Sequence, residues 1–159
     1  MKRTKRLIVI RIRGVVEAPQ KVIDTLYLLR LRRTNTAVVI DDRPDFMGMI
    51  KKVEPYIAWG EIKPEVFKEL LLKRGRLWGN KRVTPEYIKE KTGMTVDEFV
   101  EKFFKFEVEL KDIPGLKPFF RLNPPRGGYP RKGIKRPFHE GGAWGYWGEK
   151  INDLVLRMI

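Results

Sequence analysis

Residues 25–53 read TLYLLRLRRTNTAVVIDDRPDFMGMIKKV and contain three structural elements in succession. The first is the end of a helix that we expect to begin at Pro19, because proline suits a first helical turn and apolar residues follow at helical spacing. Residues 37–40, AVVI, predict a short strand. Residues 41–44, DDRP, predict a turn, and a second helix follows it until Pro55.

Two further strands flank this stretch. Residues 6–13, RLIVIRIR, are mostly β-forming and end before Gly14, and residues 56–62 predict a third strand. Residues 1–62 therefore predict the order β-α-β-α-β. For this order, pattern rules alone favour parallel strands joined by crossover helices.

The rest of the sequence divides into two segments. Residues 63–112 predict a helical lobe, with helices opened by Pro64, by Thr84 with Pro85, and by a capping box at Thr95. Its second half is slightly acidic, so we expect it to face away from nucleic acid. Residues 113–159 predict a basic extension rich in glycine and proline, ending in a helix that packs back on the domain.

The composition points to a polyanionic partner. The sequence has 34 Lys and Arg against 20 Asp and Glu, which gives a formal net charge of +14. Positive charges in such excess repel one another, and proteins that carry them usually bind a polyanion. The absence of cysteine excludes disulfides and thiolate metal sites. No stretch resembles a signal peptide or reaches membrane-spanning length, so we expect a cytoplasmic protein without a membrane partner.

The basic residues gather near the start of the sequence and in the extension. Such side chains bind phosphates, neighbouring glycines let the backbone approach RNA, and aromatic rings can stack on bases. The alternative is a solvated basic loop. The candidate RNA-binding residues near the start are Lys2, Arg3, Lys5, Arg6, Arg11 and Arg13. Those in the extension are Arg121, Arg126, Gly127, Gly128, Arg131, Lys132, Lys135, Arg136 and His139.

Other residues allow competing interpretations. Asp41, Asp42 and Asp45 could bind Mg²⁺ in an RNA-processing enzyme, but turn chemistry and compensation of helix charge explain them better. His139 lacks a partner for base catalysis, so a hydrogen bond to RNA or to the chain itself is favoured. Residues 144–147 could stack on RNA or pack the tail onto the domain, and packing is favoured. We expect no metal or cofactor.

One family resemblance joins these observations. Residues 25–38 and 42–44, with GMIKKV at 48–53, resemble the L-thirty family of large-subunit ribosomal proteins, called L-seven in eukaryotes. The extension resembles only the longer archaeal and eukaryotic members. That similarity rests on FRL (120–122), PPRGG (124–128), HEGG (139–142) and INDL (151–154).

The resemblance implies an α+β domain of ferredoxin-like type, with a small, mainly antiparallel three-stranded sheet in place of a parallel one. It implies a structural, non-catalytic component of the large ribosomal subunit that binds large-subunit ribosomal RNA and meets neighbouring proteins. In archaeal-type particles, 5S ribosomal RNA is a further contact. By position, Arg32, Arg33 and Asn35 fall on the family's helix-to-strand junction and join the candidate RNA-binding residues. A free RNA-folding chaperone remains an alternative.

Overall fold

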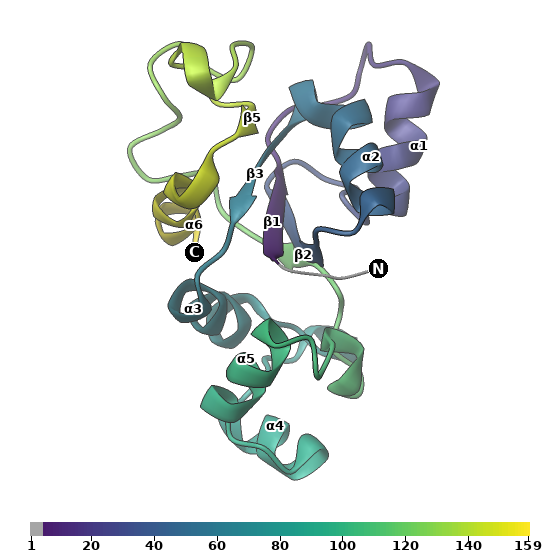
Figure 1. Ribbon diagram of the computed structural model, residues 1–159, viewed down its shortest axis with the longest axis vertical. Helices are drawn as coiled ribbons and strands as arrows, with labels where there is room; N and C mark the ends of the chain where they lie inside the picture. Colours follow the sequence, from purple (N-terminus) through teal and green to yellow (C-terminus); the bar gives the residue numbers. More distant parts are fainter. Residues whose placement is uncertain (1–4) are drawn as a thin grey trace.

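A five-stranded sheet lies at the centre of the chain, which a computed structural model describes for residues 5–159 (Figure 1). Three strands are long: β1 (Arg6–Arg11), β2 (Thr36–Asp41) and β3 (Ile57–Glu61). Two strands of two residues each, β4 (Phe120–Arg121) and β5 (Gly145–Tyr146), form the edges. The strand order is β4-β2-β1-β3-β5.

The central strands are antiparallel. β1 pairs with both β2 and β3, so that Val9 lies opposite Val38 on one side and Trp59 on the other. After the first helix the chain runs back to the end of β1, where the Asn35 N–H donates to the Arg11 carbonyl over 2.7 Å. Strand β2 therefore starts beside the end of β1, and the parallel pairing favoured by pattern rules is wrong.

The α+β class and the antiparallel central sheet are confirmed, but a sheet of three strands is wrong. The extension adds β4, which is antiparallel to β2, and β5, which is parallel to β3. Strands of two residues are too short to show the alternation of apolar and polar residues by which strands are recognised in a sequence.

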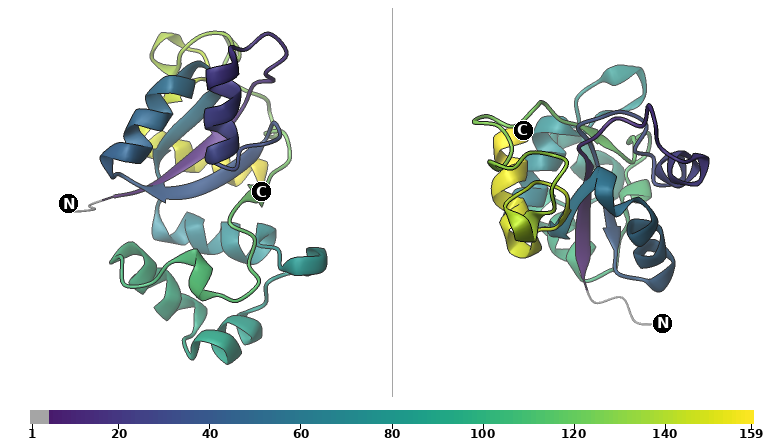
Figure 2. Two further views of the ribbon diagram at one scale, coloured as in Figure 1. Left: turned by 90° about the vertical axis from the view of Figure 1, so that its right-hand side faces the viewer. Right: turned by 90° about the horizontal axis from the view of Figure 1, so that it is seen from above.

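Helices cover both faces of the sheet (Figure 2). Helices α1 (Gln20–Leu28) and α2 (Pro44–Val53) lie on one face, and α6 (Ile151–Met158) lies on the other. Successive side chains of a strand point to opposite faces. Leu7 and Val9 of β1 therefore join the core under α1 and α2, whereas Ile8 and Ile10 join the core on the other face. All six residues of β1 are buried as a result.

The predicted helical lobe consists of α3 (Pro64–Arg74), α4 (Pro85–Thr92) and α5 (Val96–Phe104). The Thr84 and Thr95 side chains accept hydrogen bonds from the first turns of α4 and α5, which confirms the predicted helix starts. The rings of Phe67 on α3 and Phe103 on α5 stack with centroids 4.4 Å apart. The short 3-10 helices are Glu54–Tyr56, Trp78–Asn80, Leu110–Asp112, Phe138–Glu140 and Gly148–Lys150.

The end of the extension packs firmly against β3. The buried Asn152 amide donates to the Glu61 carbonyl over 3.0 Å, and its oxygen accepts from the Lys63 N–H over 2.8 Å. Trp147 is buried and stacks on Phe138 with centroids 4.3 Å apart. The apolar cluster on this face draws residues from segments 1–62, 63–112 and 113–159, whose independence as domains stays a prediction. No helix among residues 5–159 is long and apolar enough to cross a membrane.

Candidate nucleic-acid interface

Arg6 lies inside the protein. Its side chain is 2% exposed, and its guanidinium lies 3.7 Å from the centroid of the Phe103 ring. The guanidinium also donates to the Phe103 carbonyl over 3.0 Å and to the Glu109 carboxylate over 3.2 Å. A phosphate cannot reach a group enclosed in this way, so the structure gives Arg6 a role in joining β1 to the lobe.

Arg11 is buried as well. Its Nε donates to the Arg13 carbonyl over 3.1 Å, and its Nη1 donates to the Leu31 carbonyl over 3.2 Å. Desolvation by burial lowers the pKa of Arg11 from its ordinary value. The side chain thus fastens the segment before β2 to the end of β1. It is not part of the exposed surface that a ligand could contact.

Asn35 connects the helix-to-strand junction to the extension. Its φ of 68° lies in the left-handed region, which asparagine tolerates better than most residues. Its side-chain oxygen accepts from the Tyr129 hydroxyl over 3.0 Å, and its carbonyl accepts from the Leu122 N–H over 2.9 Å. Burial raises the pKa of Tyr129. Asn35 therefore holds the extension in place beside the start of β2, and its own side chain is only partly exposed to a ligand.

Exposed cations from the first 62 residues and from the extension lie around this helix-to-strand junction. Arg121 of β4 lies opposite Thr36, the first residue of β2, and Arg32 and Arg33 are exposed just before that strand. Arg32 lies over the ring of Tyr27 at 5.1 Å. Half-buried Arg13 follows β1 at the same end of the sheet. The sequence identified these residues separately, and the sheet brings them to one end.

The turn at residues 124–128 is held by a residue that the sequence analysis missed. The Gly128 N–H donates to the Pro125 carbonyl over 3.1 Å, and Gly127 between them has a φ of 80°, which favours glycine. Arg157 of α6 donates from Nη1 to the Gly128 carbonyl over 2.9 Å. Arg126 itself is exposed. Arg157 lies 29 residues from Gly128 in the sequence, so no local signal could reveal its positioning role.

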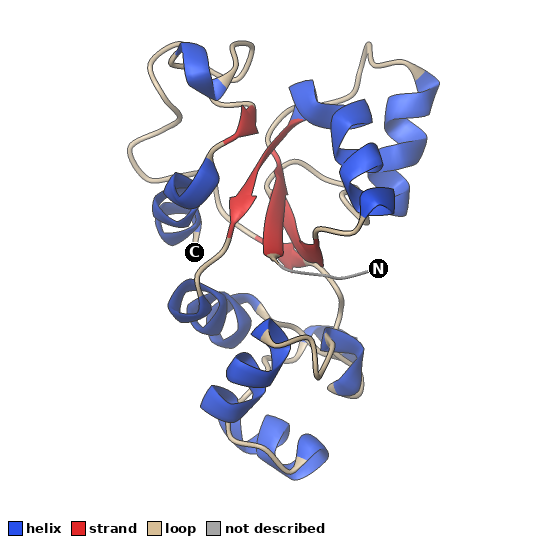
Figure 3. Cartoon of the chain, viewed as in Figure 1, coloured by secondary structure: helices blue, strands red, loops and turns tan. Residues whose placement is uncertain are grey.

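Residues 130–143, which we call the basic loop, present four exposed cations on an ordered backbone. The Gly133 N–H donates to the Pro130 carbonyl over 2.8 Å, and the Ala143 N–H donates to the Gly133 carbonyl over 3.0 Å. A side chain at Gly142 would collide with the Arg136 carbonyl. The cations are Arg131, Lys132, Lys135 and Arg136, and exposed His139 lies nearby in a 3-10 helix. Figure 3 shows how much of this part of the chain is loop.

Other candidates lie elsewhere. Lys5 forms an ion pair with Glu61 at 3.6 Å, and the register places Glu61 opposite Leu7, at the far end of β1 from Arg11. Lys2 and Arg3 lie outside the described residues. The structure therefore does not bring Lys5 to the junction where the exposed arginines meet.

The aspartates near α2 serve the local structure. Asp41 is buried and binds the Arg43 guanidinium through both oxygens, at 2.8 and 2.7 Å. This hydrogen bonding raises the pKa of Arg43. Asp45 lies in the first turn of α2, where a negative charge compensates the helix dipole. Residues 5–159 contain no cluster of acidic, histidine or cysteine side chains that could hold a metal ion.

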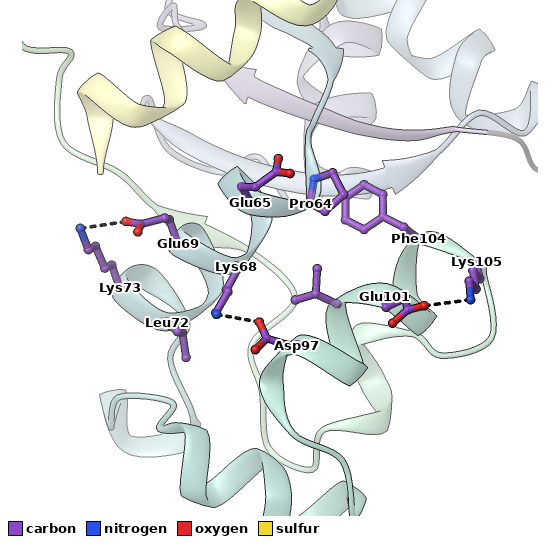
Figure 4. A pocket seen from close by; sticks show the side chains of 11 residues that line it. Pro64, Glu65, Lys68, Glu69, Leu72, Lys73, Asp97, Glu101, Phe104 and Lys105 are labelled. Atoms are coloured by element: carbon purple, nitrogen blue, oxygen red, sulfur yellow. Dashed lines mark hydrogen bonds and ion pairs between the residues drawn. The ribbon is translucent and has the colours of Figure 1, made fainter.

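A hollow between α3 and α5, of about 710 Å³, has a different character (Figure 4). Its floor includes Leu72, Val100 and Phe104. Three ion pairs surround it: Lys68 with Asp97, Lys73 with Glu69, and Lys105 with Glu101. Because these lysines are already neutralised, the hollow offers little to a phosphate.

The structure defines a small α+β protein with a five-stranded sheet, whose exposed cations lie both on helices and on the loops described above. The sequence model of the family described as "Ribosomal protein L30p/L7e" matches residues 7–57. The chain is 52% identical over 148 residues to "Large ribosomal subunit protein uL30" of Methanopyrus kandleri, covering 92% of this chain and 99% of the relative.

Two further relatives agree. The uL30 proteins of Methanococcus maripaludis strain C5 and Nanoarchaeum equitans are 50% and 48% identical over 151 residues, which is 95% of this chain and 97% of each relative. The chain therefore belongs to the family of large ribosomal subunit protein uL30. The predicted family and its archaeal type are confirmed, and this is a family of structural proteins, not of enzymes.

Proposed function

We propose that this chain is built into the large ribosomal subunit of the cytoplasmic ribosome, where it binds and stabilises large-subunit ribosomal RNA. The sheet and its helices supply a rigid platform, and the junction, the turn at residues 124–128 and the basic loop contact phosphates. Neighbouring ribosomal proteins are partners of the remaining surface. The family resemblance alone extends the proposal to 5S ribosomal RNA as a further contact.

The observation that carries the proposal is the state of the cations on the basic loop. All four are exposed, and none forms an ion pair with another residue in the part of the chain that the structure describes. Free cations on an ordered loop neutralise phosphates and release condensed counterions at little further cost in conformational entropy. The lobe differs, because several of its lysines are paired with carboxylates.

Salt-dependent binding tests this proposal. The quadruple variant Arg131→Ala, Lys132→Ala, Lys135→Ala and Arg136→Ala should bind transcribed large-subunit ribosomal RNA more weakly. The slope of log K against log [salt] should fall by roughly three units, at about 0.7–0.9 per lost phosphate contact. Filter binding between about 0.05 and 0.2 M salt measures it.

A matched control removes equal charge from the lobe. The variant with Lys89→Ala, Lys91→Ala, Lys102→Ala and Lys111→Ala loses four exposed lysines from α4, α5 and the segment after them. Its slope should stay close to that of the parent. Equal slopes for the parent and the basic-loop variant would refute RNA contact by the loop.

Incorporation into the particle needs its own test, because an RNA chaperone would also bind RNA. The tagged chain should sediment with the large subunit on a sucrose gradient after a high-salt wash. Recovery only in the free fractions would favour the chaperone.

A further inference from the structure

A short hairpin in the lobe has no role in the function described above. Residues 75–83, the lobe hairpin, connect α3 to α4. The Leu77 N–H donates to the Lys81 carbonyl over 2.7 Å, and the Val83 N–H donates to the Gly75 carbonyl over 3.3 Å. At the tip, Gly79 and Asn80 have φ values of 80° and 61°. The hairpin is therefore closed by its own backbone hydrogen bonds, which hold the residues at its tip in place.

Four arginines surround a hollow beside this hairpin, with a volume of about 590 Å³. They come from three places: the end of α3, the hairpin and the turn at residues 124–128. They are Arg74, Arg76, Arg82 and Arg126. Glu69 is the one acidic side chain among the residues described as lining the hollow, and Lys73 already pairs with it at 2.9 Å. Positive side chains therefore outnumber negative ones around the hollow.

The position of Arg76 shows how close these charges lie. Its Nη1 donates to the Gly75 carbonyl over 3.0 Å and to the Lys73 carbonyl over 3.2 Å, which fixes the guanidinium at the hollow. Burial, and then the like charges of Arg82 and Arg74, lower the pKa of Arg76. The folded chain keeps like charges together here, and an anion in the hollow would relieve their repulsion.

The tip of the hairpin carries an exposed tryptophan. Trp78 is 77% exposed, whereas Trp147 is buried and Trp59 and Trp144 are half-buried. The Trp78 backbone N–H donates to the Gly115 carbonyl over 3.1 Å, so the backbone is held in place at this residue. An exposed indole on the same short hairpin as Arg76 and Arg82 suits stacking on an unpaired nucleic-acid base.

We propose that the lobe hairpin is a second RNA-contact site, in which the hollow binds a backbone phosphate and Trp78 stacks on an unpaired base. This proposal rests on the proposed function and extends the RNA-facing surface from the extension onto the lobe. RNA fits this site better than an acidic protein does, because Arg126 belongs both to the hollow and to the turn at residues 124–128. Helix α4, whose charges balance, and the acidic helix α5 remain outside the contact.

Tryptophan fluorescence tests the stacking. The full-length chain is titrated with transcribed large-subunit ribosomal RNA, and the difference between the parent and Trp78→Phe isolates the emission of Trp78. RNA should quench this difference signal, and Trp78→Ala should weaken binding about tenfold while Trp78→Phe, which can still stack, restores it. Quenching of equal size by inorganic tripolyphosphate, or no quenching by RNA, would overturn the stacking.

Salt dependence tests the phosphate contact. The double variant Arg76→Gln and Arg82→Gln should lower the slope of log K against log [salt] by about one to two units. The matched control Lys89→Gln and Lys91→Gln on α4 should leave it unchanged. Suppose that the parent binds the RNA and that the basic-loop variant binds it more weakly. If the Arg76 and Arg82 variant then keeps the parental slope, only the hairpin proposal fails. If the parent does not bind the RNA, both proposals fail.

Discussion

The arginines of β1 and those of the basic loop have the same charge but opposite surroundings. Arg6 and Arg11 are buried, and carbonyl groups from distant segments accept their hydrogen bonds. Arg131 and Arg136 are exposed on a loop whose hydrogen bonds are made by its own backbone. A cation in a strand covered on both faces stabilises the fold, whereas a cation on an ordered loop is available to a ligand.

The largest effect should come from removing the guanidinium in the strand. Arg6→Ala leaves Glu109 without this partner and removes the packing on Phe103, so the free energy of unfolding should fall by about 3 kcal/mol. The matched change Arg136→Ala on the basic loop should cost less than about 0.5 kcal/mol. Urea unfolding followed by circular dichroism measures both. Equal stabilities for the two variants would break the contrast.

An uncharged substitution should separate the geometry of the basic loop from its charge. Gly142→Ala places a methyl group against the Arg136 carbonyl, where overpacking costs about 2 kcal/mol. RNA affinity should fall although every cation remains. Gly14→Ala is the control, because a side chain there meets open space. Filter binding compares them, and undiminished affinity of Gly142→Ala would show that the loop's shape is unimportant.

A smaller effect concerns the contact that joins the extension to β3. The Tyr146 hydroxyl donates to Glu61 at 2.6 Å, and this hydrogen bond raises the pKa of Tyr146 to about 12. The folded pKa exceeds the ordinary value of about 10. This stabilisation is therefore complete below about pH 10 and is lost as the pH rises through the folded pKa.

Tyr146→Phe should lower the free energy of unfolding by about 1 kcal/mol at neutral pH. The variant should also lose less stability than the parent when the pH rises above about 10, because it has no hydroxyl to ionise. Tyrosinate absorbance recorded against pH should lose its latest-titrating group. If Tyr146 titrates near its ordinary value in the parent, the Glu61 contact does not form.

Local patterns in the sequence predict the central elements well. The continuous apolar run in β1 reflects burial on both faces of the sheet, and the helical spacing after Pro19 and Pro44 reflects burial of one side of each helix. The direction of β2 leaves no such trace, because it depends on the return of the chain to Arg11. Family resemblance, and not periodicity, predicted the antiparallel sheet.

The candidate site was harder to predict for a similar reason. Arg6 looks like a phosphate ligand in the sequence because its partner Glu109 is 103 residues away. The arginines of the hollow beside the lobe hairpin are also scattered, between positions 74 and 126, and only the fold assembles them. Local charge density indicated the basic loop as a candidate, and its cations are exposed because loops keep their side chains at the surface, while their contact with RNA stays a prediction.

Crosslinking within purified large subunits tests most directly whether exposed loop cations, and not the basic strand, hold the RNA. Ultraviolet crosslinks identified by mass spectrometry should fall on residues 121–136 and on Arg32 and Arg33, and β1 should give none. Crosslinks confined to α4 and α5, with residues 121–136 silent, would contradict the account.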